Sequence, residues 1–228
     1  MLLDGRHNVY IAIIGDIKES KKLKNRNEVQ MRLKEILQRL NEQYQEDIAA
    51  KFMITLGDEF QGLLQKGEHV VDIIEQVQNA MHPVKLRFGI GVGEITTEIN
   101  PEMAIGADGP GYYKAREAIE TLKKSEQKNK MQTADVRIEM GQDEQTTCHM
   151  LNTIFALMTV IRNGWTDRQR EIIVDYVMYQ GSQAECALRL DITQSTVQRG
   201  LTSANYYAYA EAKNTVIKVL KEIGEKRV

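Results

Sequence analysis

Two stretches of this chain end an apolar run on the dipeptide Gly-Asp. The first closes the run Val9–Ile14 and supplies Asp16, and the second closes the alternating run Phe52–Leu56 and supplies Asp58. Turn chemistry is one explanation, because glycine and aspartate are common turn residues. The other is a pair of carboxylates that holds a metal-bound phosphate, since Mg²⁺ or Mn²⁺ takes oxygen ligands and Mg²⁺ often binds substrate phosphates as well.

The two aspartates can share an ion only if the fold brings them together. Adjacent carboxylates repel each other unless one is protonated or a cation bridges them. In a ferredoxin-like sheet the first strand lies beside the third and antiparallel to it, so Asp16 and Asp58 would converge at one edge. Glu59 is a possible third carboxylate, although the alternation of side chains along a strand argues against it. This interpretation requires that neither aspartate is locked in an unrelated ion pair.

The hydrophobic periodicity predicts the elements of such a sheet in the order strand, helix, hairpin, helix, strand. They are a buried strand over Val9–Ile14, a helix with apolar positions from Val29 to Leu40, a hairpin of Phe52–Leu56 and Phe60–Leu64, a helix from Val70 to Met81, and an alternating strand over Lys85–Gly93.

After this unit the pattern changes. We expect a third helix over residues 111–124, a polar exposed loop over 124–132, a peripheral strand within 134–140, and only helices from residue 141 onward. The predicted fold class is therefore α+β. A ferredoxin-like (βαββαβ) domain over residues 1–140 would be followed by an all-α domain over residues 141–228.

The residues after Asp16 suit a phosphate tail. Backbone amides from Ile17 to Ser20 would cradle anionic oxygens, and Lys18 and Lys21 would neutralise the remaining charge. A solvated loop is the alternative for these lysines. Gly91 and its neighbouring glycines form a bare face of the strand, which allows either a ligand or a helix to approach the backbone closely; tight internal packing is the more common reason.

Four segments carry a family resemblance. LGDEF at residues 56–60 is similar to the GGDEF signature of diguanylate cyclases, with its first glycine replaced. IIGDIKES at 13–20 resembles the first metal-binding strand of GGDEF domains and of class III nucleotidyl cyclases. RFGIGVGEI at 87–95 resembles the cyclase strand R-x-G-I-x-x-G-E, and YKAR at 113–116 resembles the helix that presents a phosphate-contacting Lys or Arg. The whole chain resembles the bacterial SatD family.

The resemblance covers residues 8–125 and implies a cyclase-type palm domain that binds a nucleoside triphosphate with Mg²⁺ or Mn²⁺. Asp16 and Asp58 would bind the metal, Glu59 and Lys114 would belong to the ligand site, and Arg116 would contact phosphate or stabilise transition-state charge. The chain departs from class III cyclases where it has Tyr112 in place of an asparagine and Ile54 in place of the purine-selecting lysine. Metal and triphosphate binding tolerate these changes better than a specific cyclisation does.

The C-terminal half contains three short predicted helices with clear start signals. Thr166 caps the first, Ser182 and Glu185 form a capping-box pattern at the second, and Thr193 caps the third. This stretch resembles the helix-turn-helix of sigma-factor region 4 and of LuxR-type regulators. The resemblance implies DNA contacts from the start of the last helix. The predicted residues are Gln194, Ser195, Thr196, Gln198 and Arg199.

A generic three-helix bundle that binds a protein or dimerises is the alternative, because acidic residues of this region nearly balance its arginines. DNA affinity draws heavily on phosphate neutralisation. A single module would therefore bind weakly, and a DNA-binding form would be a homodimer. The long helix expected from Ala204 to Ile223 has an apolar stripe suited to packing or dimerisation.

Composition sets the broader limits. The 228 residues carry a net charge of −2 with a pI near 6.1, which gives no global case for nucleic-acid binding. The apolar runs are too short for membrane insertion, and Asp4 and Arg6 interrupt the only apolar start, so we expect no signal peptide. Cys148 and Cys186 are expected to be reduced and buried, as in a cytoplasmic protein. The four histidines lack metal-ligand spacing.

These observations favour a cytoplasmic, nucleotide-responsive DNA-binding regulator. The rival is an enzyme, a nucleotidyl cyclase or transferase that makes a nucleotide signal, with the helical half as a scaffold for dimerisation or partner binding. A third possibility is a palm without ligand that serves only for dimerisation.

Overall fold

The computed structural model describes residues 9–129, 134–179 and 181–225. The chain divides into two compact units, one of Met1–Ala156 with Val216–Val228 and the other of Leu157–Thr215. The division passes through helices α4 (Gln145–Asn163) and α8 (Tyr206–Glu225). The compact units thus divide the chain at other positions than residue 141. The domain boundary expected there remains a prediction.

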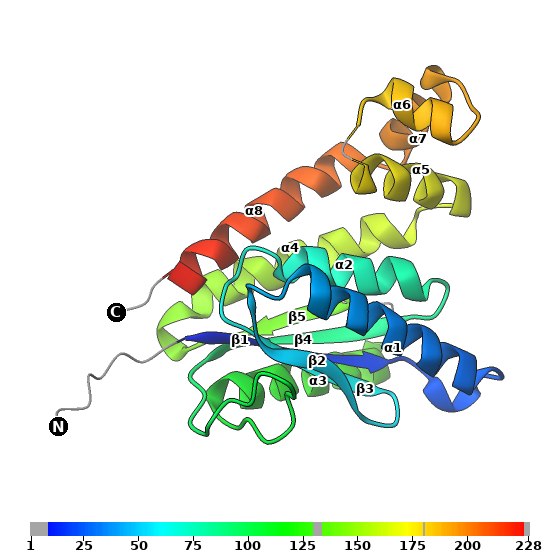
Figure 1. The fold of residues 1–228 in the computed structure, drawn as a ribbon. Coiled ribbons are helices and arrows are strands. Elements are labelled where there is room, and N and C mark those ends of the chain that lie inside the picture. Colours follow the sequence, from blue (N-terminus) through cyan, green and yellow to red (C-terminus); the bar gives the residue numbers. More distant parts are fainter. Residues whose placement is uncertain (1–8, 130–133, 180, 226–228) are drawn as a thin grey trace. The chain divides into compact units, whose positions relative to one another are not determined.

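The first unit is built on a mixed α+β arrangement in the predicted order (Figure 1). Its elements are β1 (Tyr10–Ile17), a 3₁₀ turn η1 (Ser20–Lys22), α1 (Arg26–Gln43), β2 (Ile48–Leu56), β3 (Glu59–Leu64), α2 (Val70–Met81), β4 (Leu86–Gly93), α3 (Pro110–Asn129) and β5 (Val136–Glu139), followed by the 3₁₀ turn η2 (Gln142–Glu144). The sheet order is β2-β3-β1-β4-β5. β5 is parallel to β4, and the other pairs are antiparallel. The βαββαβ layout and the peripheral last strand are confirmed.

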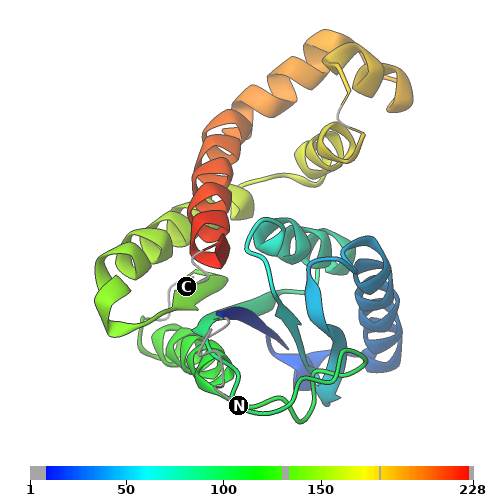
Figure 2. The ribbon, with the colours of Figure 1, turned by 60° about the vertical axis from the view of Figure 1, so that its left-hand side comes forward.

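The central strand β1 is buried on both faces because helices lie on both sides of the sheet. α1 and α2 lie on one side, and α3 with the preceding loop lies on the other (Figure 2). Ala12 and Ile14 of β1 pack in one apolar cluster with Ala115 and Ile119 of α3. Successive side chains of a strand alternate between faces, so Asp16, two residues beyond Ile14, also lies on the α3 side.

The bare glycine face of β4 allows α3 to lie directly on the strand. A Cβ atom added at Gly91 would be 2.0 Å from the carbonyl oxygen of Gly111 and 2.3 Å from the amide nitrogen of Ala115. Helix packing therefore explains Gly91. Its predicted role as a ligand contact is wrong, because α3 covers this position.

α3 continues beyond its predicted end. The stretch from Lys124 to Asn129 is helical rather than a loop, and residues 130–133 of the predicted loop lie outside the described residues. Glu126 turns inward on this extension and pairs with Arg87 of β4. A buried ionic contact thus holds a segment that looks uniformly polar in the sequence.

The second unit contains α5 (Asp167–Met178), α6 (Gln183–Arg189) and α7 (Gln194–Ser203), which lie together in Figure 1. All three predicted caps are present: Thr166 and Ser182 form capping boxes, and the Thr193 hydroxyl accepts from the amide of Thr196. Buried side chains from each helix form the core; they are Ile172, Ile173, Cys186, Ala187, Val197 and Leu201.

Cys148 and Cys186 are free and buried, as predicted. Within the described ranges, none of the helices has the length and apolar character needed to cross a bilayer.

The contact between α3 and β4 generates the first prediction. Gly91→Ala should lower the free energy of unfolding by about 2–3 kcal/mol, because the added methyl group overpacks against the backbone of α3. Gly141→Ala is the matched control: Gly141 has an extended backbone (φ −63°, ψ 163°), and the nearest atom to an added Cβ is 3.9 Å away. That control should change stability by less than about 0.5 kcal/mol. Urea denaturation measures both, and equal stabilities would contradict the described packing.

Candidate functional site

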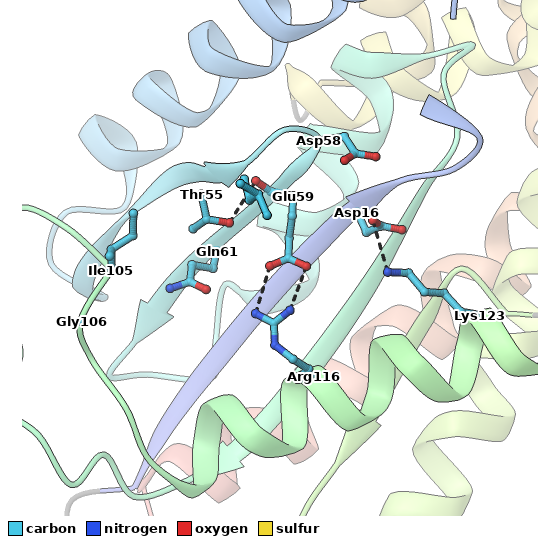
Figure 3. Close-up of a pocket in the computed structure, with 10 residues that line it drawn as sticks. Asp16, Thr55, Asp58, Glu59, Gln61, Ile105, Gly106, Arg116 and Lys123 are labelled. Carbon is cyan, nitrogen blue, oxygen red and sulfur yellow. Dashed lines mark hydrogen bonds and ion pairs between the residues drawn. The ribbon is translucent and has the colours of Figure 1, made fainter. Parts of the chain in front are cut away.

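A cleft of about 570 Å³ opens beside the end of β1, next to the β2–β3 hairpin, the loop before α3 and α3 itself (Figure 3). All of these elements belong to the first unit. The residues that line the cleft are Asp16, Thr55, Leu56, Asp58, Glu59, Gln61, Ile105, Gly106, Arg116 and Lys123.

Three carboxylates converge in this cleft. Asp16 is paired in register with Glu59 across the β1–β3 ladder, and the amide of Ile17 donates to the carbonyl oxygen of Asp58 at 3.3 Å. Paired residues of adjacent strands face the same side of the sheet, so Glu59 is not turned away, contrary to our expectation from alternation. The structure thus places Asp16 and Asp58 together at one edge.

The two Gly-Asp dipeptides have different structural roles. Gly57 has a φ of +65° in the tight turn between β2 and β3, where a side chain would be strained. Turn chemistry therefore explains the second dipeptide. The first lies inside β1 rather than in a turn. Its aspartate is 7% exposed, so the buried charge of Asp16 needs compensation.

α3 supplies two cations to the cleft. Arg116 and Lys123 are seven residues apart, so they project from the same face of the helix. Both terminal nitrogens of Arg116 donate to Glu59 at 3.0 Å, and Lys123 Nζ lies 3.6 Å from Asp16 Oδ1 (Figure 3). The Arg116 side chain is 52% exposed. An exposed pair of this kind contributes about 0–1 kcal/mol, so a charged ligand can exchange it.

Arg87 of β4 makes a different type of ion pair. Its Nη1 donates to Asp16 Oδ2 at 2.5 Å, while Nε and Nη2 donate to Glu126 Oε2 at 2.9 and 2.5 Å. The Arg87 side chain is 12% exposed, so this pair is far less exposed than the pair of Arg116 and Glu59. The sequence interpretation required Asp16 to be free of other ion pairs. That requirement is not met, because Arg87 occupies Oδ2 and Lys123 lies 3.6 Å from Oδ1.

Burial raises the pKa of Asp16 above its ordinary value, and the negative charge of Asp58 adds to this effect, whereas Lys123 and Arg87 oppose it. A further cation between the two aspartates would therefore be favourable. In the parts of the chain that the structure describes, no group of three or more His, Cys, Asp or Glu side chains is arranged to hold a metal ion. Asp16 Oδ1 and Asp58 would hold an ion only if Lys123 moved away from Oδ1 and phosphate oxygens and water completed the coordination shell.

Two residues predicted to contact phosphate, Ile17 and Lys18, already donate to acceptors inside the fold. The Lys18 amide donates to the carbonyl oxygen of Lys85 at 2.8 Å, and its Nζ pairs with Glu126 at 2.6 Å and Asp135 at 2.7 Å. The amide of Ile17 is used within the sheet, as described above. The predicted phosphate contacts of Ile17 and Lys18 are therefore wrong, because these donors already have acceptors inside the fold.

Three further predicted contacts lie away from the cleft lining. Lys114 Nζ donates to the carbonyl oxygen of Val92 at 2.7 Å. Ser20 and Lys21 lie in η1, where Ser20 accepts from the amide of Leu23. Of the residues predicted to contact the ligand rather than the metal, only Glu59 and Arg116 line the cleft.

The sequence reasoning missed Lys123, Gln61 and Leu56 as cleft residues. Leu56 was expected on the half-buried side of an alternating strand but is 81% exposed. The β2–β3 register shifts between Ile54 and Leu56, which turns the end of the strand outward. Lys123 could have been found from the sequence, because it lies two helical turns after Arg116 within the helix predicted over residues 111–124.

The family model for the SatD family matches residues 10–220. This chain belongs to the SatD family. No curated protein matches it.

The SatD-family chain is distantly similar to solved cyclase structures. The guanylate cyclase domain of RhGC from Catenaria anguillulae in complex with GTP has 13% identity and a TM-score of 0.37, covering 51% of this chain and 74% of that one. A dimeric guanylyl cyclase domain of the RhoGC fusion protein from Blastocladiella emersonii has 12% identity and a TM-score of 0.37, covering 51% and 75%. At these TM-scores the likeness is too distant to assign a ligand or an activity to the SatD-family chain.

The predicted DNA-contacting residues of the SatD-family chain lie at the start and middle of α7. Ser195 and Thr196 share hydrogen bonds of 2.9 Å with the Thr193 hydroxyl, and Gln198 accepts from Gln183. Gln194 and Arg199 are exposed, and neither has a hydrogen-bond partner within the described chain. Two of the five predicted side chains are therefore available without rearrangement.

The two kinds of ion pair in the cleft generate the second prediction. Arg87→Met should lower the free energy of unfolding by about 2–3 kcal/mol, because it removes three hydrogen bonds to two largely buried carboxylates, which keep only Lys123 and Lys18 as partners. Arg116→Met is the matched control and should cost at most about 1 kcal/mol. Chemical denaturation compares the variants. Adding Asp16→Asn and Glu126→Gln to Arg87→Met should restore most of the loss; equal losses for the two arginine variants would show that Arg87 is not the buried partner described here.

Proposed function

We propose that the cleft of this SatD-family chain binds a nucleoside triphosphate together with Mg²⁺ or Mn²⁺. The observation that carries the proposal is the gathering of three carboxylates and two accessible cations in one cleft. Asp16, Asp58 and Glu59 offer oxygen ligands, and Arg116 and Lys123 offer donors to phosphate.

The ion pairs of the cleft support an exchange of partners on binding. A metal–triphosphate complex brings both signs of charge. Arg116 would leave Glu59 for a phosphate oxygen, and Lys123 would turn from Asp16 Oδ1 to another. The freed Asp16 oxygen, with Asp58, would then hold the metal ion. Arg87 would stay in place, because its three donors are fixed between Asp16 and Glu126.

We further propose that α6 and α7 form a helix-turn-helix that binds DNA as a homodimer in the cytoplasm. The capped helices, the short turn between them and the free Gln194 and Arg199 support it. Residues 157–215 contain six basic residues (five Arg and one Lys) and six acidic residues. The resulting net charge of zero gives weak phosphate attraction for one copy, which is why the proposal includes a dimer. Nucleotide binding would then favour one DNA-binding state over another.

An active nucleotidyl cyclase or transferase is the second candidate. The carboxylate pair and Arg116 favour it, since two carboxylates and a cation can serve phosphoryl or nucleotidyl transfer. Tyr112 weighs against a class III cyclase mechanism. Its ring lies in the apolar cluster beneath the sheet, and its buried hydroxyl has no hydrogen-bond partner among the described residues.

The third prediction tests ligand binding. Each nucleoside triphosphate with Mg²⁺ or Mn²⁺ is added, and the melting temperature is measured; a ligand at 100 times its Kd should stabilise the protein by about 2.7 kcal/mol. Asp58→Asn and Asp16→Asn should weaken binding by at least about tenfold. Asp143→Asn, an exposed aspartate outside the cleft, is the control and should bind normally.

Mass spectrometry of the same mixtures separates the two candidate functions. A new cyclic or linked product that disappears in both aspartate variants would establish the enzyme. Binding without turnover would favour the regulator. No stabilisation by any nucleotide and metal would refute the proposed ligand and leave a palm that serves only for dimerisation.

The fourth prediction tests DNA binding. Selection from a library of double-stranded oligonucleotides should enrich a sequence with two related half-sites, because a dimer presents α7 twice. Arg199→Ala and Gln194→Ala should each weaken binding to that sequence by about tenfold or more. Arg39→Ala, an exposed arginine on α1, should leave it unchanged. Anisotropy titration measures the affinities, and failure to enrich any sequence would favour a protein-binding bundle.

A further inference from the structure

Two large apolar side chains line the otherwise polar cleft. Leu56, at the end of β2, is 81% exposed, and Ile105, in the loop before α3, is 47% exposed. Single exposed apolar residues are common on protein surfaces. Two that line the same cleft as a set of charged side chains suggest a ligand with an apolar part.

The cleft has two chemically different ends (Figure 3). Asp58, Asp16 and Lys123 lie toward one end, whereas Thr55, Gln61 and Ile105 lie toward the other. The pair between Glu59 and Arg116 lies between these groups. A ligand that fills the whole cleft must therefore be charged at one end and largely uncharged at the other.

Hydrogen bonds hold the uncharged end in place. Gln61 is 9% exposed, and its Nε2 donates to the carbonyl oxygen of Ala104 at 2.9 Å, which fixes Ile105 beside β3. Thr55 donates to the carbonyl oxygen of Glu59 at 3.3 Å, next to Leu56. Sites for small molecules are usually largely preformed in this way.

We propose that the uncharged end, with Thr55, Gln61 and Ile105, binds the nucleobase of the triphosphate, and that Ile105 and the cleft-lining Leu56 are its apolar contacts. The faces of a base are flat and apolar, and its edge carries hydrogen-bonding groups. Because Gln61 uses its Nε2 on Ala104, its Oε1 is the acceptor left for a base N–H. A volume of about 570 Å³ lies within the range of about 300–1,000 Å³ typical of small-molecule sites. This inference rests on the proposed function, since it assigns the second half of the same ligand.

The test compares each nucleoside triphosphate with inorganic tripolyphosphate, both with Mg²⁺, by isothermal titration calorimetry. The wild-type chain should bind at least one nucleoside triphosphate about tenfold or more tightly than tripolyphosphate. Leu56→Ser and Ile105→Ser should each weaken nucleotide binding by about tenfold and leave tripolyphosphate binding within about twofold. Leu188→Ser is the matched control, because Leu188 on α6 is 82% exposed and lies outside the cleft.

The outcomes separate this inference from the proposed function. Equal affinity of the wild-type chain for nucleotide and tripolyphosphate would overturn the base site while the phosphate site stands. An equal loss of both ligands in Leu56→Ser would also overturn it. Binding of neither ligand by the wild-type chain would refute the proposed function, and the base site with it.

Discussion

The close contact of α3 with β4 determines where the charges of α3 lie relative to the carboxylates of the sheet. Because the backbone of α3 rests on Gly91, the helix lies directly over β4 and β1. Its inward residues Ala115 and Ile119 fill the apolar cluster. Arg116, Lys123 and Glu126 on the same helix are then carried to the ends of β1, β3 and β4, where their partners are. A larger residue at Gly91 would move these three charges together.

The cleft combines two ion pairs with opposite physical roles. Arg87 is buried between Asp16 and Glu126, where removal of one partner is costly. Arg116 is half exposed on Glu59, where water already screens the interaction. The first pair fixes the carboxylate of Asp16 in one orientation, much as hydrogen bonds orient the ligands of metal sites. The second is available for exchange. A fixed carboxylate next to an exchangeable one is the arrangement that an ionic ligand needs.

Local signals predicted most of the fold, whereas side-chain pairing depended on tertiary structure. Strand alternation and helix caps act within a few residues, and the caps at Thr166, Ser182 and Thr193 are all present. The partners of Lys18 and Arg87 come from α3 and from the start of β5, far away in sequence. A pattern of residue types cannot show that these donors are occupied, which is why the predicted phosphate contact of Lys18 failed. Similarly, the exposure of Leu56 follows from a register shift that alternation alone does not reveal.

The proposed coupling of nucleotide to DNA sets a thermodynamic requirement. β3 carries Glu59 at the cleft and leads into the loop where Glu68 pairs with Lys221 of α8 at 3.2 Å. Helix α8 continues from there into the residues that follow α7. A helix that belongs to both units does not by itself couple two sites, since a ligand shifts an equilibrium only by its difference in affinity for two states. If nucleotide raises the affinity for DNA, DNA must raise the affinity for nucleotide by the same factor. The difference in nucleotide affinity between two such states would begin at the cleft, where Arg116 would exchange Glu59 for a phosphate oxygen.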